Sequence, residues 1–128
     1  MNRTIALVGD LFFATRIEDA AKQLGIPLQL VSSEQSLYSE LKAGNVGSVI
    51  VDLNFDSQNA ARIISKAKSL SNARILGFLS HVQEELATAA RHAGADAVVP
   101  RSFFAKNLGA ILQGSIWDKL KETHEASD

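Results

Sequence analysis

The stretch Ser48-Val49-Ile50-Val51-Asp52-Leu53 is the most strand-like segment of the sequence. Its apolar run shows no polar alternation, which is typical of a parallel strand that is covered on both faces. The run meets Asp52 at its end. A carboxylate directly after a buried strand needs a cation or amide partners, because an unpaired charge is costly to bury. Asp52 is therefore the first candidate site residue.

Other short apolar runs lie on both sides of this stretch, with segments of helical periodicity between them. The runs predict strands at residues 5–8, 28–31, 74–79 and 95–99. The segments between them predict helices at residues 11–24, from the Ser32–Gln35 segment to about 43, at 60–70, at about 82–93 and from about 104 onward. The predicted strand ends near residues 9, 32, 52, 79 and 99 are 20 to 27 residues apart, which fits one strand, one helix and two turns. We therefore expect an α/β fold: a five-stranded, parallel, doubly wound sheet of flavodoxin-like order 2-1-3-4-5 with five helices.

Local signals mark where two of these helices begin and where the last one is interrupted. Ser32-Ser33-Glu34-Gln35 and Ser80-His81-Val82-Gln83 each fit the capping box, in which a serine and a glutamine satisfy each other's free amides. Gly114 predicts an interruption of the last helix, because an interior glycine costs about 0.5–1 kcal/mol relative to alanine.

Length and composition limit the classes of protein. The 128 residues, 46% of them hydrophobic, suit a single domain over residues 1–128 with a polar tail from about 121. The absence of cysteine excludes disulfides, thiolate metal sites and cysteine nucleophiles. The formal net charge of -1 favours neither nucleic acid nor an anionic membrane as a partner. No apolar run is long enough for a membrane span or a signal peptide, so we expect a cytoplasmic protein.

Ligands of an open parallel sheet bind beyond the carboxyl ends of its strands. Asp10 follows the first predicted strand, Asp52 to Asn54 the third, Ser80 the fourth and Arg101 the fifth. If the first and third strands are adjacent, the two aspartates become neighbours, and such oxygen ligands suit a hard cation such as Mg²⁺. The candidate metal ligands are Asp10, Asp52 and the backbone carbonyl of Asn54. An aspartate beside a metal can also accept a phosphoryl group.

From Thr4 to about Leu120 the chain resembles the receiver domains of two-component response regulators. Val49-Ile50-Val51-Asp52 looks like the strand that ends in the family's phosphorylated aspartate, and Ala93-Gly94-Ala95-Asp96-Ala97 looks like its link into the fifth strand. The resemblance implies three site positions: Asp52 as the phosphoacceptor, Ser80 as the hydroxyl residue after the fourth strand, and Arg101 in place of the family's lysine.

The sequence departs from the family pattern at the ends of the first and fourth strands. Gly9 stands at the first position of the family's acidic pair, which leaves Asp10 alone. Counting back from Gly94 without a gap puts Leu79, rather than Ser80, at the hydroxyl position. These departures indicate a degenerate or atypical member, a pseudo-receiver.

The fifth strand departs from the pattern as well. Arg101 replaces the lysine, and Val98 stands where the family has its aromatic switch residue. The arginine guanidinium is planar and can bind a carboxylate through two hydrogen bonds, whereas the lysine ammonium is a compact point charge. The formal charges of Asp10, Asp52 and Arg101 sum to -1, one less negative than a family site of three carboxylates and one lysine. We hypothesise that Arg101 pairs with Asp52 or Asp10 and partly replaces the metal, so that Mg²⁺ binds weakly.

Simpler structural roles are open for several of these residues. Asp10 could cap the first helix, Ser80 could cap the fourth, and Arg101 could be an ordinary surface residue. Near the chain end, Trp117 could cover the core or belong to an exposed dimer patch, and core cover is favoured.

We predict a stand-alone, receiver-like signal transduction module rather than an enzyme. As the resemblance implies, it would act through a protein partner, either a sensor kinase or a downstream signalling protein, on the face formed by the fourth helix, fifth strand and fifth helix. Phosphorylation at Asp52 would be weak or absent, and the chain would be a monomer or weak dimer.

The alternative is a doubly wound domain that binds a small ligand of unknown identity in the crevice at the strand ends. Neither G-x-G-x-x-G nor G-x-x-x-x-G-K-[ST] follows a predicted strand, so dinucleotide and P-loop phosphate sites are excluded.

Overall fold

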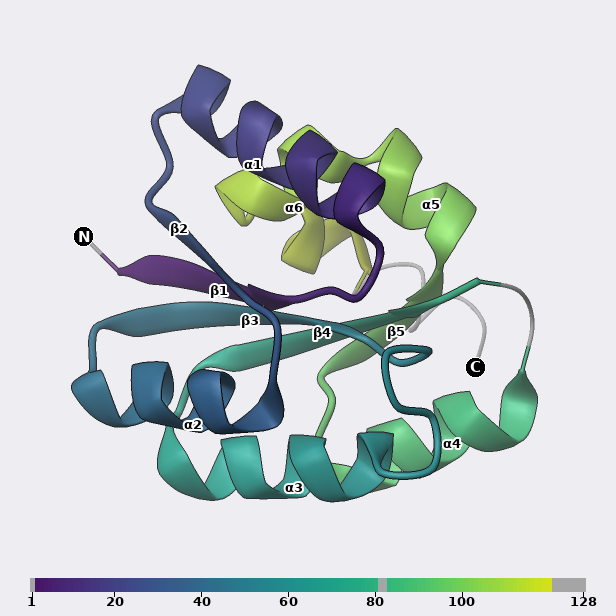
Figure 1. Ribbon diagram of the computed structural model, residues 1–128. Coiled ribbons are helices and arrows are strands. Elements are labelled where there is room, and N and C mark those ends of the chain that lie inside the picture. Colours follow the sequence, from purple (N-terminus) through teal and green to yellow (C-terminus); the bar gives the residue numbers. More distant parts are fainter. Residues whose placement is uncertain (1, 81–82, 121–128) are drawn as a thin grey trace.

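Five parallel strands form one sheet in the order β2-β1-β3-β4-β5 (Figure 1). The computed structural model describes residues 2–80 and 83–120. The strands are β1 (Arg3–Leu7), β2 (Leu28–Val31), β3 (Val46–Asp52), β4 (Arg74–Leu79) and β5 (Ala97–Pro100). The helices are α1 (Leu11–Leu24), α2 (Glu34–Ala43), α3 (Ala60–Leu70), α4 (Glu84–Ala93), α5 (Arg101–Lys106) and α6 (Leu108–Gln113). The predicted α/β class, five parallel strands and strand order are confirmed.

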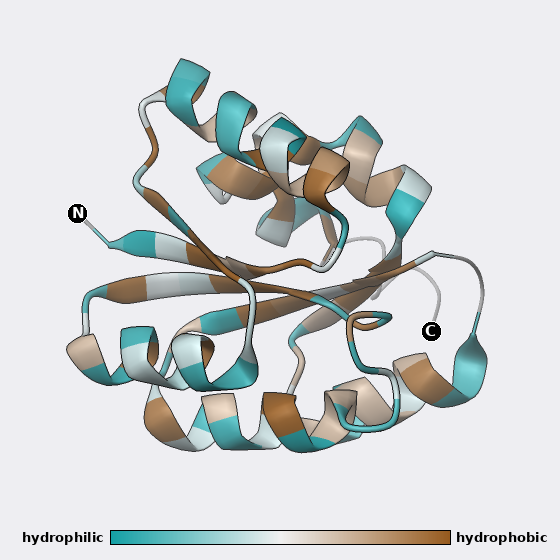
Figure 2. Cartoon of the chain, viewed as in Figure 1, coloured by the Kyte–Doolittle hydropathy of each residue, from teal (hydrophilic) through white to brown (hydrophobic). Residues whose placement is uncertain are grey.

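Helices cover both faces of the sheet. The layer of α1, α5 and α6 packs on one face, and the layer of α2, α3 and α4 packs on the other (Figure 1). Figure 2 shows that hydrophobic residues predominate in the strands, whereas hydrophobic and hydrophilic residues alternate along the helices. Ile5, Ile50 and Phe78 of the three central strands are at most 2% exposed, as expected for strands covered on both faces. Within the described residues, no helix is long and apolar enough to cross a membrane.

The strand register places the carboxyl ends of the strands at one rim of the sheet. Leu7 of β1 pairs with Val51 of β3, so the chain after β1 leaves the sheet beside the end of β3. Leu79 of β4 pairs with Pro100 of β5, so the next two strands end side by side in the same way. The loops that follow all four strands therefore meet at this rim, which we call the strand-end rim.

The start of α2 differs from the predicted capping box by one residue. Ser33, rather than Ser32, is the N-cap, and its hydroxyl accepts a hydrogen bond from the Ser36 amide at 3.1 Å. Ser33 has the extended backbone that an N-cap requires. Two adjacent serines offer alternative caps, and the capping-box spacing selected the wrong one.

The start of α4 is also later than predicted. The helix begins at Glu84, with Gln83 at the N-cap and no side-chain capping bond. Ser80 therefore does not cap α4, and the capping-box prediction is wrong here. His81 and Val82, the middle of that predicted box, lie outside the described residues.

The bounds of β3 and β5 also shift: β3 starts two residues earlier than predicted, at Val46, and β5 starts at Ala97 rather than 95. Just before β5, the Asp96 carboxylate accepts a hydrogen bond from the Ile75 amide and pairs with Lys68, both at 2.8 Å. A side-chain contact therefore links the chain to β4 at a position that was predicted to be strand.

The last predicted helix is divided into shorter ones. α5 begins at Arg101 rather than near 104, and Asn107 separates it from α6. The Asn107 side chain donates to the Phe103 carbonyl at 2.9 Å, which gives that helix end a partner. Gly114 ends α6 with a φ of 83°, so the interruption predicted at this glycine is confirmed.

The last described residues cover the core. Ile116 is 1% exposed, and Trp117 packs partly buried against the cluster beneath α1, α5 and α6. The Arg74 guanidinium lies 5.3 Å from the centre of the Trp117 ring, a cation-π contact. The interpretation of Trp117 as core cover is confirmed, whereas the predicted polar tail from about 121 lies outside the described residues.

Candidate functional site

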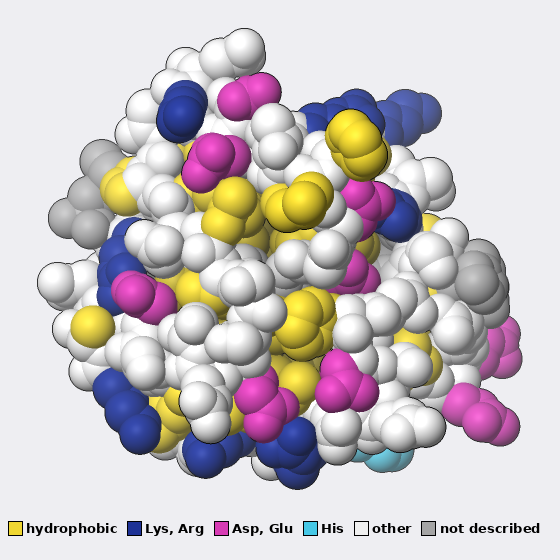
Figure 3. All heavy atoms as spheres, viewed as in Figure 1, with side chains coloured by type: hydrophobic (Ala, Val, Ile, Leu, Met, Phe, Trp, Pro, Cys, Tyr) yellow, Lys and Arg dark blue, Asp and Glu magenta, His cyan; other side chains and the backbone are white. Residues whose placement is uncertain are grey.

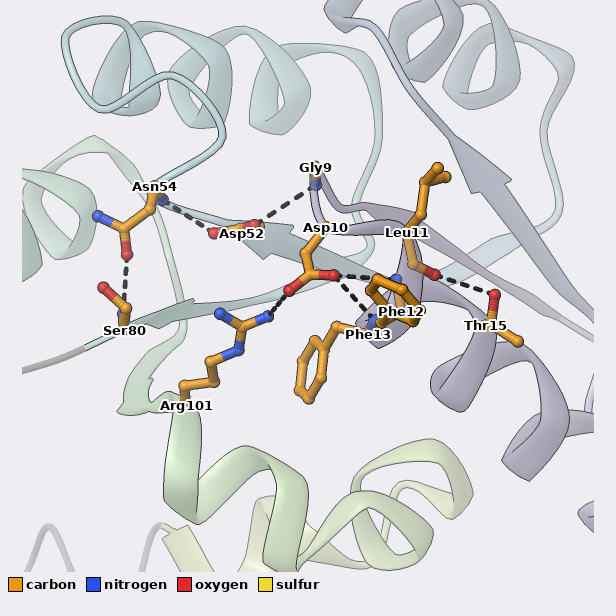
Figure 4. Close-up of polar contacts among 10 residues, drawn as sticks. All are labelled: Gly9, Asp10, Leu11, Phe12, Phe13, Thr15, Asp52, Asn54, Ser80 and Arg101. Atoms are coloured by element: carbon orange, nitrogen blue, oxygen red, sulfur yellow. Dashed lines mark hydrogen bonds and ion pairs between the residues drawn. The ribbon is translucent and has the colours of Figure 1, made fainter.

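The two aspartates predicted to be neighbours lie at the same rim (Figure 4). Asp52 is the last residue of β3, and Asp10 follows β1 as the N-cap of α1. The Gly9 amide donates to Asp52 Oδ2 at 3.4 Å, which ties the loop after β1 to the end of β3. Sequence reasoning placed these residues correctly because β1 and β3 are adjacent in the sheet.

Asp10 combines two roles that the sequence left open. Its Oδ1 accepts hydrogen bonds from the amides of Phe12 and Phe13, at 2.9 and 3.2 Å, and so caps α1. Its Oδ2 accepts a hydrogen bond from Arg101 Nη2 at 2.8 Å. The Phe13 amide and then the Arg101 hydrogen bond lower the pKa of Asp10 below its ordinary value. The carboxylate is therefore ionised at neutral pH and already has partners on both oxygens.

Arg101, the first residue of α5, points back across the rim toward Asp10 (Figure 4). Its guanidinium also lies 4.4 Å from the centre of the Phe13 ring, in reach of a cation-π contact. Phe13 in turn packs against Phe78 and Phe104, at ring separations of 5.4 and 5.6 Å. The predicted ion pair is thus found with Asp10, and it lies over a buried aromatic cluster of Phe13, Phe78 and Phe104.

Asp52 has amide partners rather than a cation among the described residues. Its Oδ1 accepts a hydrogen bond from the Asn54 amide at 3.0 Å, and its Oδ2 faces the Gly9 amide. The residue is only partly buried. Amide donors satisfy the requirement that a carboxylate after a buried strand have partners, so the alternative pair of Arg101 with Asp52 is not the one that forms.

Asn54 connects two loops of the rim, a role that sequence reasoning missed. Its side-chain carbonyl accepts a hydrogen bond from the Ser80 amide at 2.7 Å, and its side-chain nitrogen donates to Gln83 Oε1 at 2.9 Å. We call these two bonds the Asn54 clasp. The clasp holds the chain after β4 against the chain after β3, and it places Ser80 at the rim. The proposed roles of the Ser80 hydroxyl and of the Asn54 carbonyl stay predictions.

The residues at the rim do not fit a tight magnesium site. No group of three or more metal-ligating acidic or histidine side chains occurs within residues 2–80 and 83–120. The Asp10 carboxylate oxygens accept hydrogen bonds from two backbone amides and the Arg101 guanidinium, and the Asp52 carboxylate oxygens accept hydrogen bonds from backbone amides. A hard cation would have to compete with these donors for the carboxylate oxygens. The charge of Arg101 would oppose it as well.

Gly9 stands where receiver domains have the first acid of their acidic pair, and the backbone at this position does not require glycine. Its φ is not in the left-handed region. A Cβ built there would lie 3.4 Å from Phe55 Cδ1 and 4.0 Å from Asp52 Oδ2, which are ordinary contacts. The absent carboxylate is therefore a difference in side-chain chemistry, because the backbone would accept one.

A groove of about 340 Å³ lies beside the rim, between α4 and β5. Gln83, which accepts a bond of the Asn54 clasp, is one of its lining residues. Val98, predicted at the family's aromatic position, lines the groove from β5 and packs partly buried against the core. The full lining is Leu79, Gln83, Glu84, Ala87, Thr88, Arg91, Val98, Val99 and Pro100.

Comparison with known proteins gives a fold and no sequence relative. No family model matches the chain, and no curated protein sequence matches it. Among solved structures, a Burkholderia pseudomallei response regulator with a phosphorylated aspartic acid, calcium ion and citrate has a TM-score of 0.80 at 16% identity, covering 100% of this chain and 75% of that one. The receiver domain of the TMAO respiratory system response regulator TorR also has a TM-score of 0.80, at 14% identity, covering 92% and 98%.

A response regulator from Hahella chejuensis is similar to the chain at a TM-score of 0.77 and 18% identity, covering 91% of this chain and 95% of that one. All three matches run over most of the chain at identities below 20%. The fold is therefore that of response regulator receiver domains, with a strand-end rim whose residues differ from the family's pattern.

Proposed function

We propose that the chain is a receiver-like signalling module that acts by binding a protein partner, with weak or absent phosphorylation at Asp52. The observation that carries the proposal is the contact of Arg101 with Asp10 at 2.8 Å. In that contact a cationic side chain of this chain satisfies the carboxylate that would otherwise attract a divalent cation. The fold supports a role in two-component signalling, and the rim supports a member that does not depend on the phosphorylation chemistry.

The electrostatics of the rim argue against efficient phosphorylation. A phosphoryl group on Asp52 would bring additional negative charge next to Asp10, and the protein has to neutralise it. Arg101 is engaged with Asp10 and lies over Phe13, so its charge is already balanced. Gly9 contributes no side chain. For Arg101 to neutralise a phosphoryl group on Asp52, its ion pair with Asp10 would therefore have to break.

The α4–β5 groove supports binding of a protein partner such as a sensor kinase or a downstream signalling protein. Its lining combines apolar surface from residues such as Ala87 and Val98 with polar groups such as Thr88 and Arg91. Mixed surfaces of this kind are typical of transient protein interfaces. The groove adjoins the rim through Gln83, so a partner there would lie next to the candidate site.

Phosphorylation is tested with acetyl phosphate and Mg²⁺, read by intact mass. We expect the native chain to gain no more of the phosphoryl adduct than the Asp52→Asn variant, which has no acceptor at that position. Near-complete conversion of the native chain, absent in Asp52→Asn, would overturn the pseudo-receiver proposal and assign an active receiver.

Partner binding is tested with a photo-crosslinking residue at Thr88 in the groove or, as a control, at Lys42 on the exposed side of α2. We expect a cross-linked protein from Thr88 that is missing from Lys42 and is lost when Arg91→Glu is added. Equal cross-linking from both positions would contradict a specific groove.

The small-ligand alternative is examined by thermal shift against nucleotides. Stabilisation of the native chain that Asp10→Asn and Asp52→Asn abolish would replace our proposal with that alternative.

A further inference from the structure

The exposed side of α1 carries large apolar side chains at its first turn. Leu11 is 81% exposed and Phe12 is 91% exposed, and Figure 3 shows hydrophobic side chains at the surface over this part of the molecule. Phe12 borders an open groove of about 530 Å³ whose other wall contains Ala105 of α5 and Leu108 of α6. Leu11 and Phe12 are adjacent and both exposed, and contiguous exposed apolar surface is typical of interaction sites.

The residues that α1 contributes to this groove have a symmetric order. They are Phe12, Thr15, Arg16, Asp19, Ala20 and Gln23. If two copies of α1 pack antiparallel about a two-fold axis between residues 17 and 18, each position faces its counterpart at the same distance on the other side of the axis. Every one of the six residues then meets another of the six.

The pairs created by this symmetry are chemically complementary. Arg16 of one copy faces Asp19 of the second copy, and the two-fold axis repeats the pair. Both side chains are exposed, and neither has an ion-pair partner in the part of the chain that the structure describes. The charges on this surface are therefore available to a second copy and have opposite signs where the copies meet.

The other pairs fit the same packing. Thr15 faces Ala20 of the second copy on either side of the axis, and two small side chains there allow the helices to approach closely. Phe12 faces Gln23 of the second copy and can cover its aliphatic part. The most exposed apolar side chain of the groove thereby loses contact with water.

We propose that a second copy of this chain occupies the groove, forming a two-fold dimer through antiparallel packing of α1. α1 has 14 residues, about 21 Å at 1.5 Å per residue, so one helix pair buries less than the ~800 Å² per partner of a standard interface. The dimer is therefore weak and reversible. It does not depend on the proposed partner groove, because α1 and α4 cover opposite faces of the sheet.

Charge exchange tests the dimer by sedimentation velocity over micromolar to millimolar concentrations. Arg16→Glu and Asp19→Arg each turn two attractive contacts into repulsive ones, so we expect each to raise the dimer Kd about tenfold. The double variant Arg16→Glu with Asp19→Arg restores opposite charges in the reverse sense and should restore the native Kd. Lys42→Glu makes the same change in net charge as Arg16→Glu on a distant helix and should leave the Kd unchanged.

Cysteine cross-linking tests the orientation, because the native chain contains no cysteine. A disulfide needs Cβ atoms about 3.5–4.5 Å apart, so a mixture of Thr15→Cys and Ala20→Cys chains should oxidise to a mixed dimer faster than either variant alone. A chain that stays monomeric at millimolar concentration overturns the proposal. So does a dimer whose Kd ignores the charge exchange, or one in which Thr15→Cys alone cross-links as fast as the mixture.

Discussion

The two halves of the strand-end rim are held together by different kinds of contact. On the side of α1 and α5, the charges of Asp10 and Arg101 meet at 2.8 Å above the Phe13 ring. On the side of α3 and α4, the neutral Asn54 side chain connects Ser80 and Gln83. The first half depends on ionised groups and an aromatic support, whereas the second depends on amide hydrogen bonds that neither pH nor salt removes near neutrality.

The difference separates the receiver fold from the receiver's site chemistry. Both halves bring the strand-end loops together through contacts between residues of the chain itself. In both halves, donors of the chain itself face acceptors at the rim, and every carboxylate oxygen of Asp10 and Asp52 accepts at least one such hydrogen bond. One fold can carry different site chemistries, and in this chain the carboxylates at the rim have hydrogen-bond partners from the chain itself.

Removing the aromatic support is the strongest way to break the charged half. Phe104 is 0% exposed and stacks on Phe78 at 4.5 Å, so Phe104→Ala should lower the free energy of unfolding by about 3–5 kcal/mol. The matched control is Ile64→Ala, also from a fully buried residue but on the opposite face of the sheet. Its expected loss is about 2–5 kcal/mol.

Denaturant unfolding measures both losses, and NMR shifts of the Arg101 side chain distinguish the two variants. We expect those shifts to change in Phe104→Ala and to stay in Ile64→Ala, because of the two substituted residues it is Phe104 that packs against the Phe13 ring beneath the guanidinium. Equal shift changes in both variants would mean that the aromatic cluster gives the ion pair no particular support.

Introducing the residues that the receiver-domain pattern has at positions 9 and 101 should convert the charged half into a metal site. Gly9→Asp combined with Arg101→Lys adds a carboxylate beside Asp52 and replaces the planar fork by a point charge. The formal charge of the site becomes more negative by one, so we expect Mg²⁺ to bind about tenfold more tightly than to the native chain. An NMR titration of the Asp10 and Asp52 signals measures the affinity, with Gly9→Asn and Arg101→Lys as the control. An unchanged affinity would show that the residues at positions 9 and 101 do not determine how tightly the rim binds Mg²⁺.

The sequence predicted the contacts that follow from topology and missed those that depend on loop geometry. The neighbouring positions of Asp10 and Asp52 follow from adjacent strands, and the alternation of short and long apolar segments was enough to predict these. The choice of Asp10 over Asp52 as the partner of Arg101 was left open, because it depends on where α5 begins. α5 begins at Arg101 itself, earlier than its apolar spacing indicated.

The Asn54 clasp and the start of α4 were missed for one shared reason. An asparagine two residues after a strand is compatible with many turns, and its partners become evident only when the chains after β3 and β4 are placed side by side. The clasp holds the Ser80 amide, and α4 starts later, at Glu84. A serine followed three residues later by glutamine is a helix-start signal only if the chain there is free to turn.

Breaking the neutral half should have a smaller effect than breaking the core. Asn54→Ala removes the two side-chain bonds to Ser80 and Gln83, and each net hydrogen bond contributes about 0.5–1.5 kcal/mol. We expect the free energy of unfolding to fall by about 1–3 kcal/mol and the Ser80 amide to exchange faster with solvent. Gln29→Ala, which removes one exposed bond to the Leu30 carbonyl, is the control. Native exchange at Ser80 in Asn54→Ala would contradict the clasp.

The smallest expected effect comes from removing the charge of Arg101 while keeping its length, in Arg101→Met. The Phe13 amide is the largest cause of the lowered Asp10 pKa and the Arg101 hydrogen bond the next, so the pKa should rise toward 3.8 without reaching it. A carboxyl whose pKa is lower in the folded than in the unfolded state stabilises the fold above its unfolded pKa and loses this contribution as the pH falls through the folded value. The native chain should therefore lose more stability below pH 3.8 than Arg101→Met does.

The control for this prediction is Asn54→Ala, which should keep the native acid dependence, since Asn54 makes no contact with Asp10 among the described residues. Carboxyl NMR titration of Asp10 and unfolding at a series of acidic pH values measure the two effects. If Asn54→Ala changed the acid dependence as much as Arg101→Met, the two halves of the rim would act as one electrostatic unit rather than as a charged half and a neutral half.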